Sequence, residues 1–168
     1  SSDVCSSDLA QINNLSADKV ALIETEDLVQ LTTTAVGALN ASVVQALTPG
    51  QASSLTTDQI TVMTSNIGSL SAAAVTALTT DQFSALTAAQ IDSLSADKIA
   101  AIETEDLVQL STEKIAALSN GTIQSLTNAQ ILGMSTDQLD ALTAGQVATL
   151  SDAQKAGLTT DQIGLLNN

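Results

Sequence analysis

Several residue types that most enzymes need are missing from the sequence. It contains no histidine, arginine, tryptophan or tyrosine, and Phe83 is its only aromatic residue. Without histidine, a Ser–His or Cys–His nucleophile cannot be built. Without aromatic rings, a sugar-stacking surface is not expected, and a core has to consist of Leu, Ile, Val and Ala. These absences argue against an enzyme, and we predict no catalytic and no cofactor-binding residues.

Positive charge is also scarce. Four Lys stand against 18 carboxylates, which gives a net charge of −14. Such a charge repels the phosphates of nucleic acids and the surface of anionic membranes. The chain also has no run of about 18 apolar residues, the minimum for a transmembrane helix. We therefore expect no nucleic-acid partner and no membrane insertion; the expected partners are other proteins or neighbouring repeats of the same chain.

The single cysteine, Cys5, cannot form a disulfide within the chain. It lies in residues 1–9, SSDVCSSDL, which repeat the triplet SSD and resemble translated adaptor sequence at the ends of some metagenomic genes. We interpret residues 1–9 as a non-native segment. Residues 10–168 are interpreted as one array of repeats, itself a fragment of a longer array.

An eight-residue repeat fills this array. Apolar residues make up 44% of the chain, and they recur in pairs three residues apart, each pair following the last by five. About 20 such pairs run from Ile12/Leu15 to Ile163/Leu166, with Ala52 and Lys155 as the weak members. Repeats of this kind are typical of solenoids, in which each unit contacts mainly its neighbours.

The array also contains a duplicated block and one slip. Residues 15–31 read LSADKVALIETEDLVQL, and residues 94–110 read LSADKIAAIETEDLVQL, a near-identical copy. The second copy begins one residue short of ten repeats after the first, because one residue is missing between Met63 and Ile67. We expect this slip, near Ser65, to kink the superhelix or to shorten one turn.

The repeat length excludes a continuous helix. Eight residues advance an α-helix by two turns and about 80°, so the apolar pairs would not stay on one face. In a straight strand the odd spacings would place the two members of each pair on opposite faces. A β-solenoid with a corner in every repeat remains the alternative, and the many Thr and Val would suit it.

The polar residues favour a short helix that restarts in every repeat. Ser or Thr follows the second apolar residue in most repeats, and Gln often stands three residues later, immediately before the next apolar pair. Ser/Thr-x-x-Gln is a capping-box pattern. It occurs with Gln51, Gln59, Gln82, Gln90, Gln130, Gln138, Gln146, Gln154 and Gln162. Pro49 follows Thr48 at the first helical position, where proline is tolerated. We predict an all-α solenoid with one helix of about seven residues in each repeat.

Departures from the pattern have structural interpretations. Glu24 and Glu103 replace the capping hydroxyl, so those two helices are expected to begin at Thr25 and Thr104. Lys155 marks either a frayed repeat or an aliphatic stem whose ammonium reaches solvent. Gly133 and Gly157 stand just before the second apolar residue, where a helix end tolerates glycine.

Three kinds of chemistry are conceivable for such residues. The two ETED segments, with Glu24, Glu26 and Asp27 and with Glu103, Glu105 and Asp106, could hold Ca²⁺ weakly, but no Ca²⁺-binding loop pattern is present. Their simpler interpretation is a solvated helix start, so we predict no metal site. Two further hypotheses, a Ser–Lys nucleophile and an ice-binding row of Thr, are disfavoured because the hydroxyls are needed as helix caps.

The phrases ALTTDQFSALTAAQI and GLTTDQIGLL resemble the ALTTAQ-type octapeptide arrays of very large bacterial surface or secreted adhesin-like proteins. The resemblance implies a bacterial origin, a location at the cell surface or outside the cell, and a role as stalk or scaffold. It carries over no functional residue. The alternative is a protein- or peptide-binding solenoid, but the positions between paired apolar residues are mostly small, which favours the stalk.

Overall fold

The computed structural model describes residues 11–166, apart from the side chain of residue 65. Residues 1–9, interpreted above as non-native, lie outside the described residues. The chain divides into two compact halves, one ending at Leu86 and the other beginning at Thr87. Each half is described by itself.

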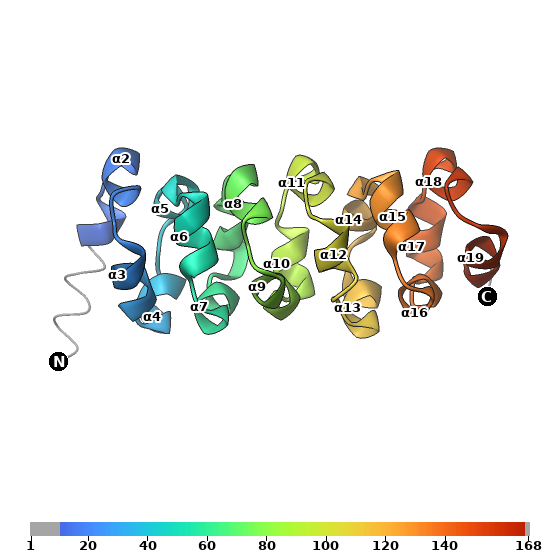
Figure 1. Ribbon diagram of the computed structural model, residues 1–168, viewed down its shortest axis with the longest axis horizontal. Coiled ribbons are helices and arrows are strands. Elements are labelled where there is room, and N and C mark those ends of the chain that lie inside the picture. Colours follow the sequence, from blue (N-terminus) through green and yellow to red (C-terminus); the bar gives the residue numbers. More distant parts are fainter. Residues whose placement is uncertain (1–10, 167–168) are drawn as a thin grey trace. The chain divides into compact units, whose positions relative to one another are not determined.

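Short helices fill the described part of both halves (Figure 1). The N-terminal half contains α2 (Ala17–Val20), α3 (Thr25–Gln30), α4 (Thr33–Gly37), α5 (Ala41–Ala46), α6 (Pro49–Ser54), α7 (Thr57–Val62), the 3-10 helix η1 (Thr64–Ser69), α8 (Ala72–Thr76) and α9 (Thr80–Ala85). The C-terminal half contains α10 (Ala88–Asp92), α11 (Ala96–Ala100), α12 (Thr104–Leu107), α13 (Thr112–Ala117), α14 (Asn120–Ser125), α15 (Asn128–Gly133), α16 (Thr136–Asp140), α17 (Ala144–Thr149), α18 (Asp152–Ala156) and α19 (Thr160–Leu165). Residues 11–166 contain no strand, so the all-α solenoid is confirmed and the β-solenoid alternative is wrong.

The helices are shorter than the seven residues expected, and each ends at or before the second apolar residue of its repeat. The helices that the structure describes have four to six residues. Leu47, which ends α5, has φ −60° and ψ 129°, and Leu118, which ends α13, has φ −64° and ψ 146°. These extended residues turn the chain toward the next N-cap, and their side chains still point into the core. If the helix continued through this residue, the chain would not change direction here, and the next helix could not begin at the following N-cap.

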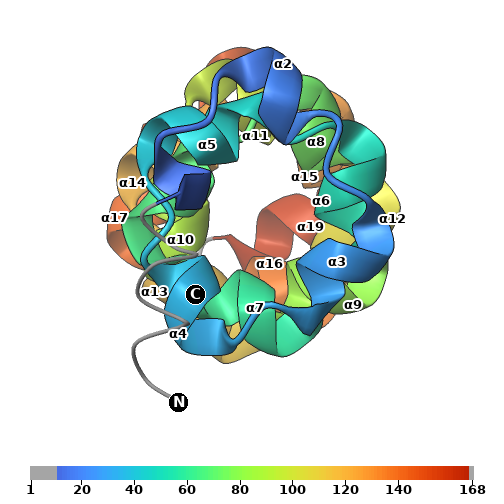
Figure 2. The same ribbon diagram turned by 90° about the vertical axis from the view of Figure 1, so that its left-hand side faces the viewer.

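Within each half the chain winds as a right-handed superhelix. Contacts join helices three apart, such as α3 with α6 and α4 with α7 in the N-terminal half, and α11 with α14 and α14 with α17 in the C-terminal half. In Figure 2 the path from α2 through α3 and α4 to α5 turns clockwise as it recedes from the viewer. Successive turns within each half stack on one another.

The core consists of the paired aliphatic residues. Ile60, Met63, Ile67 and Leu70 have no exposed surface, and Phe83 is 1% exposed. Ala52, a weak member of the pattern, is fully buried as well. Burying each aliphatic side chain contributes about 1.5–3 kcal/mol, so the seam supplies most of the stabilisation of helices too short to persist alone.

The missing residue near Ser65 is absorbed by a tighter helix. The repeat after Met63 forms the 3-10 helix η1 without a side-chain cap. The Asn66 side chain donates to the carbonyl of Leu39, 27 residues earlier, at 2.8 Å. The equivalent bond of Gln59 reaches Leu31, 28 residues earlier. The expectation that the slip shortens one turn is therefore confirmed, by one residue.

The slip places a β-branched residue in a strained conformation. Thr64 has φ 45°, in the left-handed region that costs residues other than glycine about 1–2 kcal/mol. We expect Thr64→Gly to raise the free energy of unfolding by about 1 kcal/mol, measured by urea denaturation. Thr61→Gly, in the ordinary helical backbone of α7, is the matched control and should lower it by about 0.5–1 kcal/mol. A loss of stability in both variants would contradict strain at Thr64.

Gly133 has a stronger structural role than a tolerated helix end. A Cβ atom at this position would lie 2.2 Å from Cγ2 of Thr104, the first residue of α12. At Gly157 the nearest atom to such a Cβ would be 3.8 Å away, an ordinary contact. The expectation for Gly157 holds, whereas Gly133 permits a close approach of two turns that the local sequence does not reveal.

This difference predicts opposite effects of alanine at the two glycines. Gly133→Ala is expected to lower the free energy of unfolding by about 1–2 kcal/mol, because Thr104 has to move. Gly157→Ala should raise it by about 0.5 kcal/mol, since alanine has the better helix propensity. Adding Thr104→Ala to Gly133→Ala should recover most of the loss in thermal denaturation. Failure of this rescue would mean that contact with Cγ2 is not the cause.

Candidate functional site

Capping boxes begin nine of the helices in residues 11–166, as the sequence indicated. In each, the Ser or Thr hydroxyl accepts from the backbone N–H of the Gln three residues later, and the Gln side chain accepts from the backbone N–H of the cap. Pro49 occupies the first position of α6, as predicted. Helices α3 and α12 begin at Thr25 and Thr104, also as predicted, with Glu24 and Glu103 at the N-cap but no side-chain hydrogen bond. The N-cap therefore holds the same place in the repeat in helices α2 to α19, and only η1, with Met63 at its N-cap, departs from it among the described helices.

The same glutamines also connect successive turns of the solenoid. Gln146 accepts from the N–H of Thr143 through Oε1 at 2.8 Å, and its Nε2 donates to the carbonyls of Ile115 and Leu118, both at 2.8 Å. Those carbonyls lie at the end of α13, where helix geometry leaves carbonyls free to accept further hydrogen bonds; the Ile115 carbonyl also accepts from the N–H of Leu118. One side chain thus caps the start of its own helix and the end of another.

This arrangement recurs in both halves. Gln51, Gln59 and Gln82 reach the preceding turn in the N-terminal half, and Gln130, Gln138, Gln146 and Gln154 do so in the C-terminal half, mostly over 28 and 31 residues. All seven side chains are at most 3% exposed. The separation of 28 residues corresponds to about three and a half repeats in each turn of the superhelix. We call this set the glutamine ladder.

The sequence contained a signal for the ladder that the capping argument overlooked. A capping box accepts either Glu or Gln at its third helical position, N3. Here that position is Gln in all nine boxes and Glu in none. A carboxylate can receive the N–H of the cap but cannot donate to the carbonyls of another turn. The exclusive use of Gln therefore indicates a donor role.

In two repeats without Gln, a side chain of the preceding turn accepts the hydrogen bond from the backbone N–H of the N-cap. In α14, where N3 is Thr122, the Asp92 carboxylate accepts from the N–H of Ser119 at 3.0 Å and from the hydroxyl of Thr122 at 2.6 Å. In α5, the Asn13 side chain accepts from the N–H of Asn40 at 2.8 Å. Asn13 and Asp92 each lie two residues before a copy of the duplicated block, so the two substitute contacts hold equivalent places in the array.

The two ETED segments differ in exposure. Glu24, Glu26 and Asp27 are exposed, whereas Asp106, the counterpart of Asp27, is only 9% exposed. Within residues 11–166, no group of three His, Cys, Asp or Glu side chains is placed to hold a metal ion. Cys5 lies outside the described residues.

The pKa shifts in the described residues fall in α13. A hydrogen bond from its own backbone, and a second from Ser111, lower the pKa of Glu113, which is exposed. Burial lowers the pKa of Lys114. The shift of the Glu113 pKa follows from its hydrogen bonds in the first turn of the helix, and that of the Lys114 pKa from burial.

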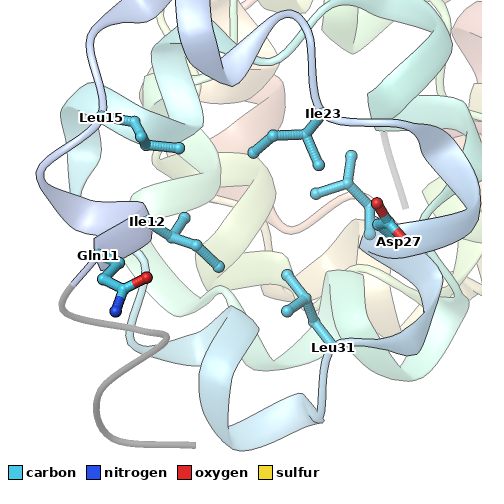
Figure 3. Close-up of a pocket in the computed structure, with 7 residues that line it drawn as sticks. Gln11, Ile12, Leu15, Ile23, Asp27 and Leu31 are labelled. Carbon is cyan, nitrogen blue, oxygen red and sulfur yellow. The ribbon is translucent and has the colours of Figure 1, made fainter.

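A cavity of about 380 Å³ lies at the first described turn. Its lining residues are Gln11, Ile12, Leu15, Ile23, Asp27, Leu28 and Leu31. In Figure 3, the side chains of Ile12, Leu15, Ile23 and Leu31 point toward one shared space. They are half-buried, whereas their counterparts in the duplicated block, Ile91, Leu94, Ile102 and Leu110, are buried. Among the described residues, this first turn has no preceding turn packed on it.

Lys155 lies in the last described turn of the C-terminal half. It is half-buried and lines a cavity of about 150 Å³ with Val147, Ile163 and Leu166. Its helix α18 begins with a complete capping box at Ser151 and Gln154. The repeat is therefore not frayed, and the alternative of an aliphatic stem packed on the seam is the one that the structure supports.

Capped helices of four to six residues, wound with about three and a half repeats in each turn, define a repeat solenoid. Within residues 11–166, every helix falls short of the length and apolar content of a bilayer-spanning segment. The family model of the ALTTAQ repeat matches residues 20–57 and 99–136, two stretches that begin at equivalent positions of the duplicated block. These two stretches thus match the ALTTAQ repeat, which confirms the resemblance found in the sequence. No curated protein and no solved structure matches it.

Proposed function

We propose that this chain is a non-enzymatic spacer or scaffold in a bacterial cell-surface or adhesion-associated protein. The observation that carries the proposal is the glutamine ladder, which uses the polar side chains of the repeats to join one turn to the next. Hydroxyls that could serve as nucleophiles accept capping hydrogen bonds instead. A fold whose polar side chains form hydrogen bonds that hold its own turns together suits a mechanical role.

The duplicated block supports the same role. A spacer gains length when repeats are copied, without any need to change individual residues. Residues 94–110 differ from residues 15–31 at only two positions, and both changes exchange small or aliphatic residues. A site that recognises a particular ligand would be disturbed by such copying unless both copies bind.

The experiment places the chain between a bacterial surface anchor and an epitope tag. Deleting residues 15–93 removes one duplication unit and keeps the repeats in register. We expect this deletion to reduce antibody access to the tag through the surface polysaccharide of intact cells. Changing the exposed first-turn residues Thr57, Thr80, Thr136 and Thr160 to alanine should leave access unchanged.

Two outcomes would overturn this function. Access that does not depend on the block would exclude a spacer. Access that is lost in the alanine variant, with helicity retained, would favour a binding scaffold that uses its exposed surface. The location is tested separately, by antibody labelling of intact and lysed cells of the bacterium that carries the gene; labelling only after lysis would exclude the cell surface.

A further inference from the structure

The sequence contains a single Asn–Gly pair, Asn120–Gly121, and it lies in the first turn of α14. Asn120 is the first helical residue and Gly121 the second, and both are exposed. Within the C-terminal half, α14 contacts α11 of the preceding turn and α17 of the following one. The pair is therefore open to solvent at a helix that joins three turns of the solenoid.

An asparagine followed by glycine can react with its own main chain. The backbone nitrogen of Gly121 attacks Cγ of Asn120, its proton passes to solvent, and the side-chain amide leaves as ammonia. The product is a cyclic succinimide, and water opens it at either carbonyl to give aspartate or isoaspartate. In sum, water is consumed and ammonia released, with no oxidant or reductant. Glycine permits the attack because no Cβ atom shields its backbone nitrogen.

The packing of α14 does not explain the glycine. Beyond its chain neighbours and the backbone of its own helix, a Cβ atom at Gly121 would meet only Oγ of Ser119, at 3.8 Å. Gly133, by contrast, is required by the close approach of Thr104. Gly121 also has no positive φ, so its backbone conformation is open to other residues. Alanine at this position should therefore be tolerated, which makes Gly121→Ala a clean test variant.

The hydrogen bonds at the start of α14 do not involve the reacting nitrogen. The Ser119 hydroxyl accepts from the N–H of Thr122 at 3.2 Å, and the Asp92 carboxylate accepts from the N–H of Ser119 at 3.0 Å. The N–H of Gly121 belongs to the first turn, where a helix supplies no acceptor of its own. Closing the succinimide ring needs only this first turn to open, and helix ends fray at a low free energy.

Two other asparagines show what distinguishes Asn120. Asn40 is held at both ends of its amide, because its Oδ1 accepts from a backbone N–H and its Nδ2 donates to a backbone carbonyl. Asn128 is exposed and is the first residue of α15, as Asn120 is of α14, but alanine follows it. The Asn120 amide lies beside Gly145 of the following turn, with Nδ2 3.5 Å from where a Cβ atom there would be. Asn128 is thus the matched control.

From these observations we propose that Asn120 is a site of spontaneous deamidation, and that its isoaspartate product releases the start of α14 from the preceding turn. Isoaspartate carries the main chain through its side chain, so the first turn of the helix becomes longer. The N–H of Thr122 then moves away from the Ser119 hydroxyl, together with the Thr122 hydroxyl that donates to Asp92 at 2.6 Å. The new carboxylate also brings negative charge toward Asp92, which is bonded to the adjacent residue.

The test incubates the folded full chain in mildly alkaline buffer at physiological temperature and then digests it with trypsin. Cleavage after Lys114 and Lys155 gives the peptide 115–155, which contains both Asn120 and Asn128. Fragmentation mass spectrometry locates the change from amide to acid and distinguishes aspartate from isoaspartate, and a sample without incubation corrects for conversion during digestion. Asn120 should convert several-fold faster than Asn128. Gly121→Ala should reduce conversion at position 120 to the level of Asn128.

Thermal denaturation of the same samples tests the structural consequence. The incubated wild type should unfold at a lower temperature than the fresh protein, whereas incubated Gly121→Ala should not. Asn120→Asp adds the charge without the longer main chain. It should lose less than the incubated wild type, because the helix dipole favours a carboxylate in the first turn.

An Asn120 that stays intact in the folded chain would overturn the proposal, and its conversion in guanidinium chloride would then assign the protection to α14. Equal rates at Asn120 and Asn128 would exclude the role of Gly121. A deamidated chain that melts like the fresh one, or Asn120→Asp that loses as much as the incubated wild type, would contradict release by isoaspartate. None of these results would affect the spacer function, since an unmodified array can still separate two domains.

Discussion

Replacing Gln146 with alanine is expected to lower the free energy of unfolding by about 3 kcal/mol. The side chain is 1% exposed and makes three hydrogen bonds of 2.8 Å, one to its own cap and two to the preceding turn. Its removal leaves the buried carbonyl of Leu118 and the N–H of Thr143 without these partners, at about 1–3 kcal/mol for an unsatisfied buried group, whereas the carbonyl of Ile115 still accepts from the N–H of Leu118. It also leaves a cavity in a close-packed interior.

Gln162 provides the matched control for this prediction. It forms the same capping box in α19 but is half-buried, and its amide makes a single exposed bond of 3.2 Å to the carbonyl of Leu132. Gln162→Ala should therefore cost about 1 kcal/mol or less, the value of a cap near the surface. Urea denaturation followed by circular dichroism measures both variants. Equal losses would mean that the ladder adds nothing beyond its capping boxes.

The local part of the fold could be predicted from the sequence because its causes lie within one repeat. A hydroxyl, a glutamine three residues later and the apolar pair act over fewer than eight residues, and Pro49 confirms their register. The start of each helix and the identity of the core residues follow directly. These are the features for which side-chain chemistry and backbone geometry agree.

The number of repeats in a turn could not be predicted in this way. It depends on the angle between successive helices, which is fixed by the backbone of linker residues such as Leu47 and Leu118. Leucine at the second apolar position gives no information about ψ, so the partner 28 residues away stayed unknown. The cross-turn role of Gln146 and the close approach of Gly133 to Thr104 were missed for this reason.

Ile123 and Lys155 show that the residue type a seam position accepts depends on whether another turn of the solenoid covers it. Both are the first apolar member of their repeat, four repeats apart. Ile123 is fully buried, and its carbonyl accepts from Gln154 of the following turn. Lys155 belongs to the last described turn and is half-buried, so its ammonium can reach water while its stem covers the seam.

Ile123→Lys is accordingly expected to lower the free energy of unfolding by about 4 kcal/mol or more near neutral pH, because an unpaired ammonium would be buried. Burial lowers the pKa of such a lysine below its unfolded value of about 10.4. The unfolded state then binds more protons than the folded state, so the stability of this variant should rise with pH between the two pKa values. Denaturation at pH ~6 and pH ~10 measures the difference.

The reverse substitution, at Lys155, distinguishes the effect of burial on stability from the effect of charge. Lys155→Ile should raise the free energy of unfolding by about 1 kcal/mol, since it extends the aliphatic seam at a half-buried position. This gain should depend little on pH in the same range. Ile123→Met, which keeps the volume and adds no charge, should cost less than about 1.5 kcal/mol. If Ile123→Lys were no worse than Ile123→Met, the interior of the C-terminal half would have to admit water, and a dry aliphatic seam closed by the glutamine ladder would be the wrong description of this solenoid.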